Sequence, residues 1–328
     1  MSDNSNAPKR ADATSSFREE AQRHEIWRAA QSEADLVRAN LECIRFHCEA
    51  FDIPREVRAC AALVGFEDIV RAAGRGVIES SVKVVNGVPH PARFNILCSP
   101  DDKLSFLHQM FTFVENVART DSIRLDLRPV REMLVGADLS RVSQMVCGVD
   151  LRADKMDSRL KIWVFADHEP GNANDPIERA LASGRVDPRF HSIHVHPALL
   201  LGYDLRFDGA TALKMYPDVW EEELGTPAIW SRLAGVFSRA AMSVMREAYW
   251  THFYLSSAEK EPALDLHLKC PDEFLDRWLS NPIMDRIHRT YRGCPMLDVV
   301  AAIPQSELER APVKNFTLYY MPARICDR

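Results

Sequence analysis

Cationic and aromatic side chains recur two residues apart in several short segments of this 328-residue chain. Residues two apart on a β-strand point to the same face of the sheet. The pairs are Lys161 with Trp163, Lys214 with Tyr216, and His267 with Lys269. Each pair alone is also typical of a strand face in contact with solvent, so the repetition of the pattern is the informative feature.

Side chains of these types have a definite chemistry when they meet in one cavity. Converging cations bind a polyanion such as a diphosphate. Aromatic faces stabilise a carbocation and keep water away from it. A carboxylate such as Glu79 can orient an acceptor or take its proton. Together these groups predict a site that ionises an allylic diphosphate and captures the cation.

Five strand pairs, separated by helical segments, are predicted to position these residues. They fall at about residues 77–98, 143–166, 201–217, 244–270 and 295–321. Asn86–Gly87 and Asp208–Gly209 are the turn signals of two of them. Ten antiparallel strands can close on themselves, with helices outside and a mixed inner face. We therefore predict an α+β fold built on a closed barrel, although the alternation alone does not say which face is inside.

Composition limits the function classes. A net charge of −6 argues against a nucleic-acid partner, and no run approaches the roughly 18 apolar residues of a membrane helix. The eight cysteines form no C-x-x-C pair, as expected for a cytoplasmic protein. The histidines of HSIHVH, residues 191–196, do not share one helix face, so no metal site is predicted. Residues 1–20 are predicted to be a disordered tail, and 21–328 a single domain.

Four segments, in order, resemble the cyanobactin-type peptide prenyltransferases, which belong to the ABBA or PT-barrel class. The segments are CGVDLRADKMDSRLKIWVF, YDLRFDGATALKMYPDVWEEE, PALDLHLK, and SELER followed by VKNFTLYY. As a set they are fairly specific, and the resemblance runs from about residue 40 to 322. It implies a ten-stranded antiparallel PT barrel of five αββα repeats, with helices outside and the active site in the lumen.

The resemblance implies a peptide prenyltransferase. Such an enzyme moves a dimethylallyl group, less often geranyl, from its diphosphate to a ribosomal peptide. Dimethylallyl diphosphate is then the co-substrate, with Mg²⁺ carried on the diphosphate and not in a protein cage. A monomer is expected. Two other functions stay open: prenylation of a free indole or phenol, and a barrel that only binds a peptide or ligand. Few residues follow Tyr320, which favours a mouth open to a peptide.

The expected roles of individual residues follow from the resemblance and from the strand faces. The catalytic carboxylates are Glu79 and Asp265. The diphosphate-binding residues are Arg93, Lys161, Lys214, Tyr216, Lys269 and Tyr319. The residues that shield the cation and shape the pocket are Trp163, Phe165, His267, Tyr320 and Tyr254.

Two departures from the resembled family concern the acceptor. Trp163 and Phe165 stand where relatives have further polar residues, and Asp265 and His267 stand where relatives often have tyrosines. A carboxylate in the lumen pairs well with a guanidinium, and Glu79 could share the proton transfer with Asp265. We therefore predict the arginine guanidine as acceptor. Tryptophan and tyrosine acceptors stay open, as does a purely structural pairing of Asp265 with Lys269.

Overall fold

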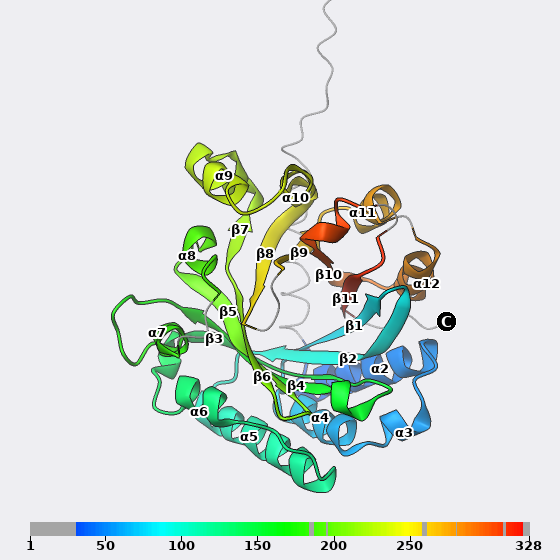
Figure 1. Ribbon diagram of the computed structural model, residues 1–328. Helices are drawn as coiled ribbons and strands as arrows, with labels where there is room; N and C mark the ends of the chain where they lie inside the picture. Colours follow the sequence, from blue (N-terminus) through cyan, green and yellow to red (C-terminus); the bar gives the residue numbers. More distant parts are fainter. Residues whose placement is uncertain are drawn as a thin grey trace, which may run out of the picture.

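The structure, a computed structural model, describes residues 31–183, 187–194, 196–257, 261–279, 281–310 and 313–323. The predicted disordered tail at residues 1–20 lies outside these ranges. The described strands and helices alternate in pairs along the chain, as the repeat pattern predicts (Figure 1).

The strands are β1 (Val77–Val85), β2 (Val88–Cys98), β3 (Val142–Asp150), β4 (Arg159–Asp167), β5 (Ala198–Arg206), β6 (Thr211–Tyr216), β7 (Asp218–Trp220), β8 (Ala248–Ser256), β9 (Ala263–Leu268), β10 (Met296–Pro304) and β11 (Phe316–Pro322). The helices are α2 (Glu33–Ala50), α3 (Arg55–Arg58), α4 (Ala61–Ala72), α5 (Lys103–Thr120), α6 (Arg128–Leu134), α7 (Pro176–Ala182), α8 (Phe190–Ile193), α9 (Pro227–Ala234), α10 (Arg239–Val244), α11 (Pro271–Trp278) and α12 (Pro282–Tyr291).

One antiparallel sheet closes on itself. Its strands follow the order β6-β5-β4-β3-β2-β1-β11-β10-β9-β8-β7, and β6 also pairs with β8. Pro217 separates β6 from β7, because proline has no backbone N–H to give to a strand ladder. Counted as one interrupted strand, β6 and β7 make this a ten-stranded barrel of five hairpins, which confirms the predicted fold.

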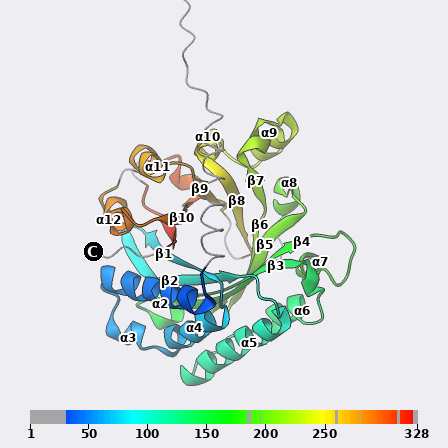
Figure 2. The same ribbon diagram turned by 180° about the vertical axis from the view of Figure 1, so that it is seen from behind.

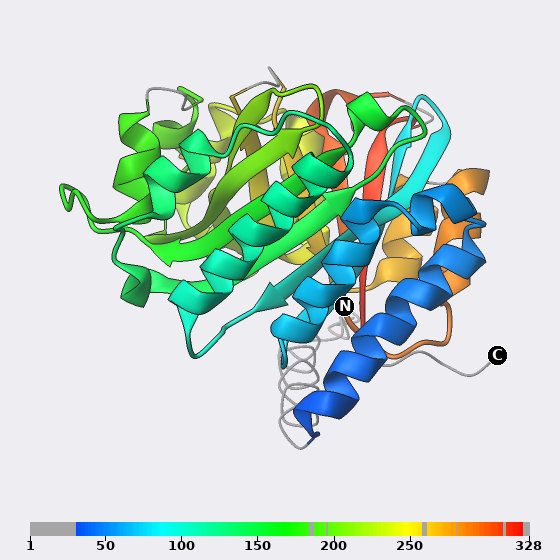
Figure 3. The same cartoon turned by 90° about the horizontal axis from the view of Figure 1, so that it is seen from below.

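The helices lie around the outside of the ring of strands (Figures 1 and 2). Seen from the side, α2, α4 and α5 run across the outer face of the sheet (Figure 3). Outward residues of the strands pack against them, such as Phe94 and Ile162 against the layer that contains Phe66 and Met110. The hydrophobic core is therefore the shell between barrel and helices, and the inner face of the sheet is left for polar and aromatic residues.

One hairpin boundary differs from the prediction. The fourth hairpin begins at Ala248 and not near residue 244, because α10 and a short 3-10 helix occupy the preceding residues. Met242, Val244 and Met245 are all buried, so their apolar pattern fits helix and strand equally well. Asn86 and Gly87 have φ of 50° and 79°, which confirms the predicted two-residue hairpin turn. No helix in the described ranges is long and apolar enough to cross a bilayer.

Gly202 of β5 is required by a close approach between strands. A Cβ at this position would lie 2.5 Å from the Cα of Trp163, which faces Gly202 across β4 and β5. We predict that Gly202→Ala lowers the free energy of unfolding by about 1–3 kcal/mol, because strand or ring must shift. Chemical denaturation measures this. Gly225→Ala, where a Cβ meets nothing within 4 Å, is the control. Equal stabilities for both variants would contradict the argument.

Candidate active site in the barrel lumen

The lumen holds two adjoining cavities, of about 240 Å³ and about 310 Å³. The first, the cationic compartment, contains lysine and arginine side chains of β1, β2, β4 and β6. The second, the acid–aromatic compartment, is lined mainly by rings and carboxylates. Four side chains line both cavities and form the wall between them: Trp163, Tyr216, Asp265 and Tyr319.

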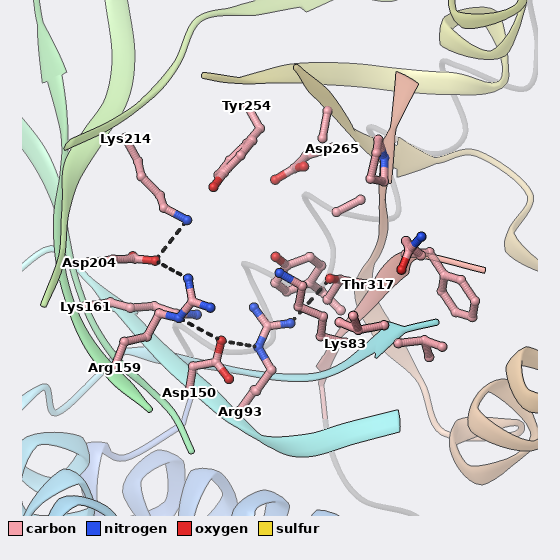
Figure 4. A pocket seen from close by; sticks show the side chains of 18 of the residues that line it. Lys83, Arg93, Asp150, Arg159, Lys161, Asp204, Lys214, Tyr254, Asp265 and Thr317 are labelled. Carbon is pink, nitrogen blue, oxygen red and sulfur yellow. Dashed lines mark hydrogen bonds and ion pairs between the residues drawn. The ribbon is translucent and has the colours of Figure 1, made fainter. Parts of the chain in front are cut away.

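Five cations face the cationic compartment, each from an inward position of its strand (Figure 4). They are Lys83, Arg93, Arg159, Lys161 and Lys214. Strand alternation gives them a common face, since each lies an even number of residues from its inward neighbours on the same strand. Such a cluster is suited to an anion with several charged oxygens.

Two buried aspartates hold these cations together. Asp150 of β3 lies 3.1 Å from Nε of Arg93 and 3.4 Å from Nε of Arg159. Asp204 of β5 lies 3.1 Å from Arg159 and 2.9 Å from Lys214. Arg159 therefore joins the two carboxylates into one network, which Figure 4 shows.

The ion pairs of this network lower the pKa values of its two carboxyl groups. Burial alone opposes ionisation of Asp150, but Arg93, Arg159 and Arg152 hold its pKa well below the usual value. In the same way Lys214 and Arg159 outweigh burial and lower the pKa of Asp204 to about 2. Both carboxylates are thus charged at every working pH, and they neutralise part of the positive charge.

Lys83 differs from the other cations. No described residue forms a hydrogen bond or ion pair with its ammonium group, although Lys83 lines the cavity. Burial, with repulsion from Arg93 and Arg159, lowers the pKa of Lys83 to about 8. An anion in the cationic compartment would meet a donor here that no carboxylate already occupies.

Aromatic rings lie next to the cations. The Nζ atom of Lys161 is 5.1 Å from the Trp163 ring centroid, and that of Lys214 is 4.5 Å from the Tyr254 centroid. The ring of Tyr216 lies 5.6 Å from Trp163 and 5.5 Å from Tyr254. Lys214 and Tyr216 line the same cavity, as predicted for residues two apart on one strand, and the Tyr254 ring also lies beside the Lys214 ammonium group. The rings form a continuous apolar surface beside the anion-binding groups.

Glu79 belongs to the acid–aromatic compartment and is linked to the cations. Lys161 donates to Oδ1 of Asn95 at 3.1 Å, and the amide nitrogen of Asn95 donates to Glu79. Gly148 makes room for this link, since a Cβ there would meet the Asn95 side chain and lie 2.8 Å from the Phe94 carbonyl oxygen. Burial raises the pKa of Glu79, and the hydrogen bond from Asn95 fixes the position of its carboxyl group.

The other acid–aromatic residues come from β8, β9 and β10. Burial raises the pKa of Asp265 to about 7. His267 forms a hydrogen bond through Nδ1 with Asp298. The ring of Trp250 lies 4.7 Å from His267 and 4.1 Å from His252. This compartment therefore combines three carboxylates, counting Glu79, with stacked rings.

Most predicted site residues lie in the lumen, on the predicted faces. They are Glu79, Arg93, Lys161, Trp163, Phe165, Lys214, Tyr216, Tyr254, Asp265, His267 and Tyr319. Their roles in catalysis, diphosphate binding and shielding of the cation stay predictions.

Two predicted residues lie elsewhere, and their expected roles are corrected here. Lys269 follows the end of β9 and pairs with Glu221 of a 3-10 helix on the outside of the barrel, donating also to the Arg246 carbonyl at 2.9 Å. It is therefore no partner of Asp265. Tyr320 points outward, because it alternates with Tyr319, and stacks on Tyr291 of α12 with centroids 4.1 Å apart. It fills the core under a helix and does not shield the lumen.

The lumen also contains residues that the sequence analysis did not assign to the site. They are Lys83, Asp150, Arg159, Asp204, Trp250, His252 and Asp298. Alternation within each strand could have found several, because Lys83 shares the face of Glu79, and Arg159 that of Lys161. Asp298 carried no such signal, since β10 has no other charged residue.

The described residues contain no group of three His, Cys, Asp or Glu side chains that could hold a metal ion. Asp150 and Asp204, the carboxylates nearest the cations, are already engaged by arginine and lysine. This side-chain set fits an anion and not a protein-held cation. Magnesium carried on a diphosphate stays a prediction, and no step below depends on it.

Comparison with solved structures identifies the fold class. The structure is similar to 6-dimethylallyltryptophan synthase from Micromonospora olivasterospora in complex with DMASPP and Trp, at a TM-score of 0.57 and 15% identity, over 90% of this chain and 98% of that one. It is also similar to 5-dimethylallyltryptophan synthase from Streptomyces coelicolor in complex with DMASPP and Trp, at 0.56 and 14%, over 91% and 98%. This chain therefore has the ABBA, or PT-barrel, fold.

The family is shown by sequence. Residues 38–322 match the family described as "Family of unknown function (DUF5838)", and the chain belongs to it. No curated protein matches the chain. The cyanobactin-type resemblance is thus supported at the level of the fold, and the finer assignment is part of the proposal below.

We predict that Lys83→Ala weakens binding of inorganic diphosphate roughly tenfold, the size expected for one charged hydrogen bond. Binding to the unmodified protein should weaken as the pH rises from 7 to 9, because Lys83, with its pKa of about 8, and Lys161, whose pKa burial lowers to about 7, lose their charges. Lys83→Ala should lack the part of this pH dependence that Lys83 contributes. Isothermal titration calorimetry measures both.

Lys269→Ala is the matched control, since this lysine lies on the outside. An equal loss of affinity in the two variants would show that the diphosphate does not bind in the cationic compartment.

Proposed function

We propose that the chain is a prenyltransferase that moves a dimethylallyl group from its diphosphate to a side chain of a ribosomal peptide. The observation that carries this proposal is the arrangement of the lumen. Five cations adjoin a wall of aromatic rings, and carboxylates lie on the other side of that wall. The cations suit the leaving group, the aromatic rings suit the carbocation, and the carboxylates suit the acceptor.

The first step needs the carbon–oxygen bond of the donor to break. The cations neutralise the charge that develops on the departing diphosphate, and Lys83 supplies a donor that is not yet engaged. The allylic cation then lies against Trp163, Tyr216 and Tyr319, whose ring faces stabilise positive charge. These rings also keep water from the cation, which favours transfer to the acceptor over hydrolysis.

The acceptor occupies the acid–aromatic compartment in this proposal. Glu79, Asp265 and Asp298 all line this cavity of about 310 Å³. A guanidinium pairs with a carboxylate through two parallel hydrogen bonds and stacks on aromatic planes such as Trp250. We therefore propose the arginine guanidine of a peptide as the acceptor. A base in this compartment takes the nitrogen's proton while the new carbon–nitrogen bond forms.

An aromatic acceptor is the second candidate. Its support is the set of rings in the same cavity, which includes Trp163, Phe165 and Trp250 and could stack on an indole or phenol. The two similar structures are of dimethylallyltryptophan synthases in complex with DMASPP and Trp. The abundance of carboxylates favours the guanidine, since an indole needs only one proton acceptor.

Peptides that differ in one residue separate these candidates. With dimethylallyl diphosphate and matched arginine, tryptophan and tyrosine peptides, we expect mass spectrometry to show prenyl addition to the arginine peptide. Asp265→Asn should reduce that reaction by about ten- to a hundredfold, because the loss of a buried charged pair costs roughly 1.5–3 kcal/mol.

Asp272→Asn serves as the control, because Asp272 lies on the outside beside His288. If Asp265→Asn prenylates the arginine peptide as fast as the unmodified protein does, the proposed guanidine acceptor is wrong. Preference for the tryptophan or tyrosine peptide would favour the second candidate, and no consumption of the donor with any acceptor would contradict a prenyltransferase.

A further inference from the structure

Two β-bulges lie at the base of the acid–aromatic compartment. In β8 the pairing with β9 shifts between Ala248 and Trp250, and in β10 the pairing with β11 shifts between Met296 and Asp298. A bulge adds one residue to a strand and turns side chains away from strict alternation. Tyr249 and Leu297 are the extra residues here. The result is a cluster that regular strands would not form.

Asp298 is the centre of this cluster. Its carboxylate accepts a hydrogen bond from Nδ1 of His267 and interacts with the hydroxyl group of Tyr249. The rings of Tyr249 and Trp250 lie 5.8 Å and 4.7 Å from the His267 ring. The imidazole is thus fixed by a carboxylate on one edge and by rings on its sides.

The other ring nitrogen is free to act. Within the described residues no hydrogen bond to Nε2 of His267 is formed, and the ring lines the same cavity as Glu79. A carboxylate on Nδ1 holds the proton on that nitrogen, so the lone pair of a neutral imidazole is on Nε2. Such an Asp–His pair is a common way to position a general base.

We propose that His267, positioned by Asp298, accepts the proton of the acceptor group. This inference rests on the proposed function and names the base of that same site. As the bond from the acceptor nitrogen to the allylic carbon forms, the carbon–oxygen bond of the donor breaks and its electrons leave with the diphosphate. The nitrogen's proton moves to Nε2, and the imidazolium next to Asp298 later gives it to solvent.

The charges around His267 set the pH range of this step. The titratable groups that face it are Asp298 from β10, Asp265 from β9, Glu79 from β1, and His252 and Tyr249 from β8. Burial alone would lower the pKa of His267, but Asp298 and the other carboxylates raise it above the ordinary value. The imidazole is therefore a stronger base than a free histidine and is available once the pH exceeds its pKa.

The test compares pH profiles of His267→Gln, Asp298→Asn and His288→Gln. His288 is the matched control, since it also pairs with an aspartate, Asp272, at 3.0 Å, but on the outside of the barrel. For the unmodified protein we expect kcat/KM to rise with pH through the pKa of His267. His267→Gln should lower kcat by about 10²–10⁴-fold and abolish this rise.

Asp298→Asn keeps the imidazole but removes the charge beside it, so the rise should move to lower pH. His288→Gln should leave the profile unchanged. NMR titration of the histidine rings checks the pair without any turnover: the His267 signal should titrate above the ordinary value, and Asp298→Asn should lower that pKa.

A His267→Gln variant with the pH profile of the unmodified protein would overturn the inference and leave the proposed function standing. A profile that does not move in Asp298→Asn, while NMR shows the pKa of His267 lowered, would also overturn it. If the unmodified protein transfers no prenyl group to any acceptor, the proposed function fails and the inference falls with it.

Discussion

Two buried carboxylates make the rest of the lumen possible. Five cations in one cavity repel each other and are poorly solvated, so by themselves they would lose protons or open the barrel. Asp150 and Asp204 each contact two or more of them, and Arg159 bridges the pair. The net charge that remains is positive and attracts an anion, while the strands hold the charged side chains in place. The positions of Arg93, Arg159 and Lys214 depend on this balance.

The balance also separates two kinds of lysine. Lys214 is committed to Asp204, whereas Lys83 keeps a lowered pKa and no carboxylate partner. A bound anion would complete the charge balance that the two aspartates leave open. On the opposite side of the aromatic wall the charges are reversed, because carboxylates outnumber cations there. The lumen is thus polarised along its axis, with an anion favoured at one end and a cation at the other.

The fold was largely predictable from the sequence, because hairpin turns and strand alternation are local signals. Alternation showed which residues of β4 and of β6 share a face, but not which face is inward. What could not be predicted depends on contacts between distant strands. Lys269 continues the inward parity of Asp265 and His267, but β9 ends before it and Glu221 captures its charge. Asp298 could not be assigned to the site from its own strand, because its hydrogen-bond partner His267 lies on a neighbouring strand that is distant in sequence.

The shared wall links the two compartments thermodynamically. Trp163, Tyr216, Asp265 and Tyr319 contact both cavities, so a ligand in either one restricts the same four side chains. The first ligand to bind orders these side chains, and this ordering costs conformational entropy. The second ligand then binds to side chains that are already ordered. Such coupling is reciprocal: each ligand must raise the affinity of the other by the same factor. If donor and acceptor bind as proposed, the wall that separates them therefore also couples their binding.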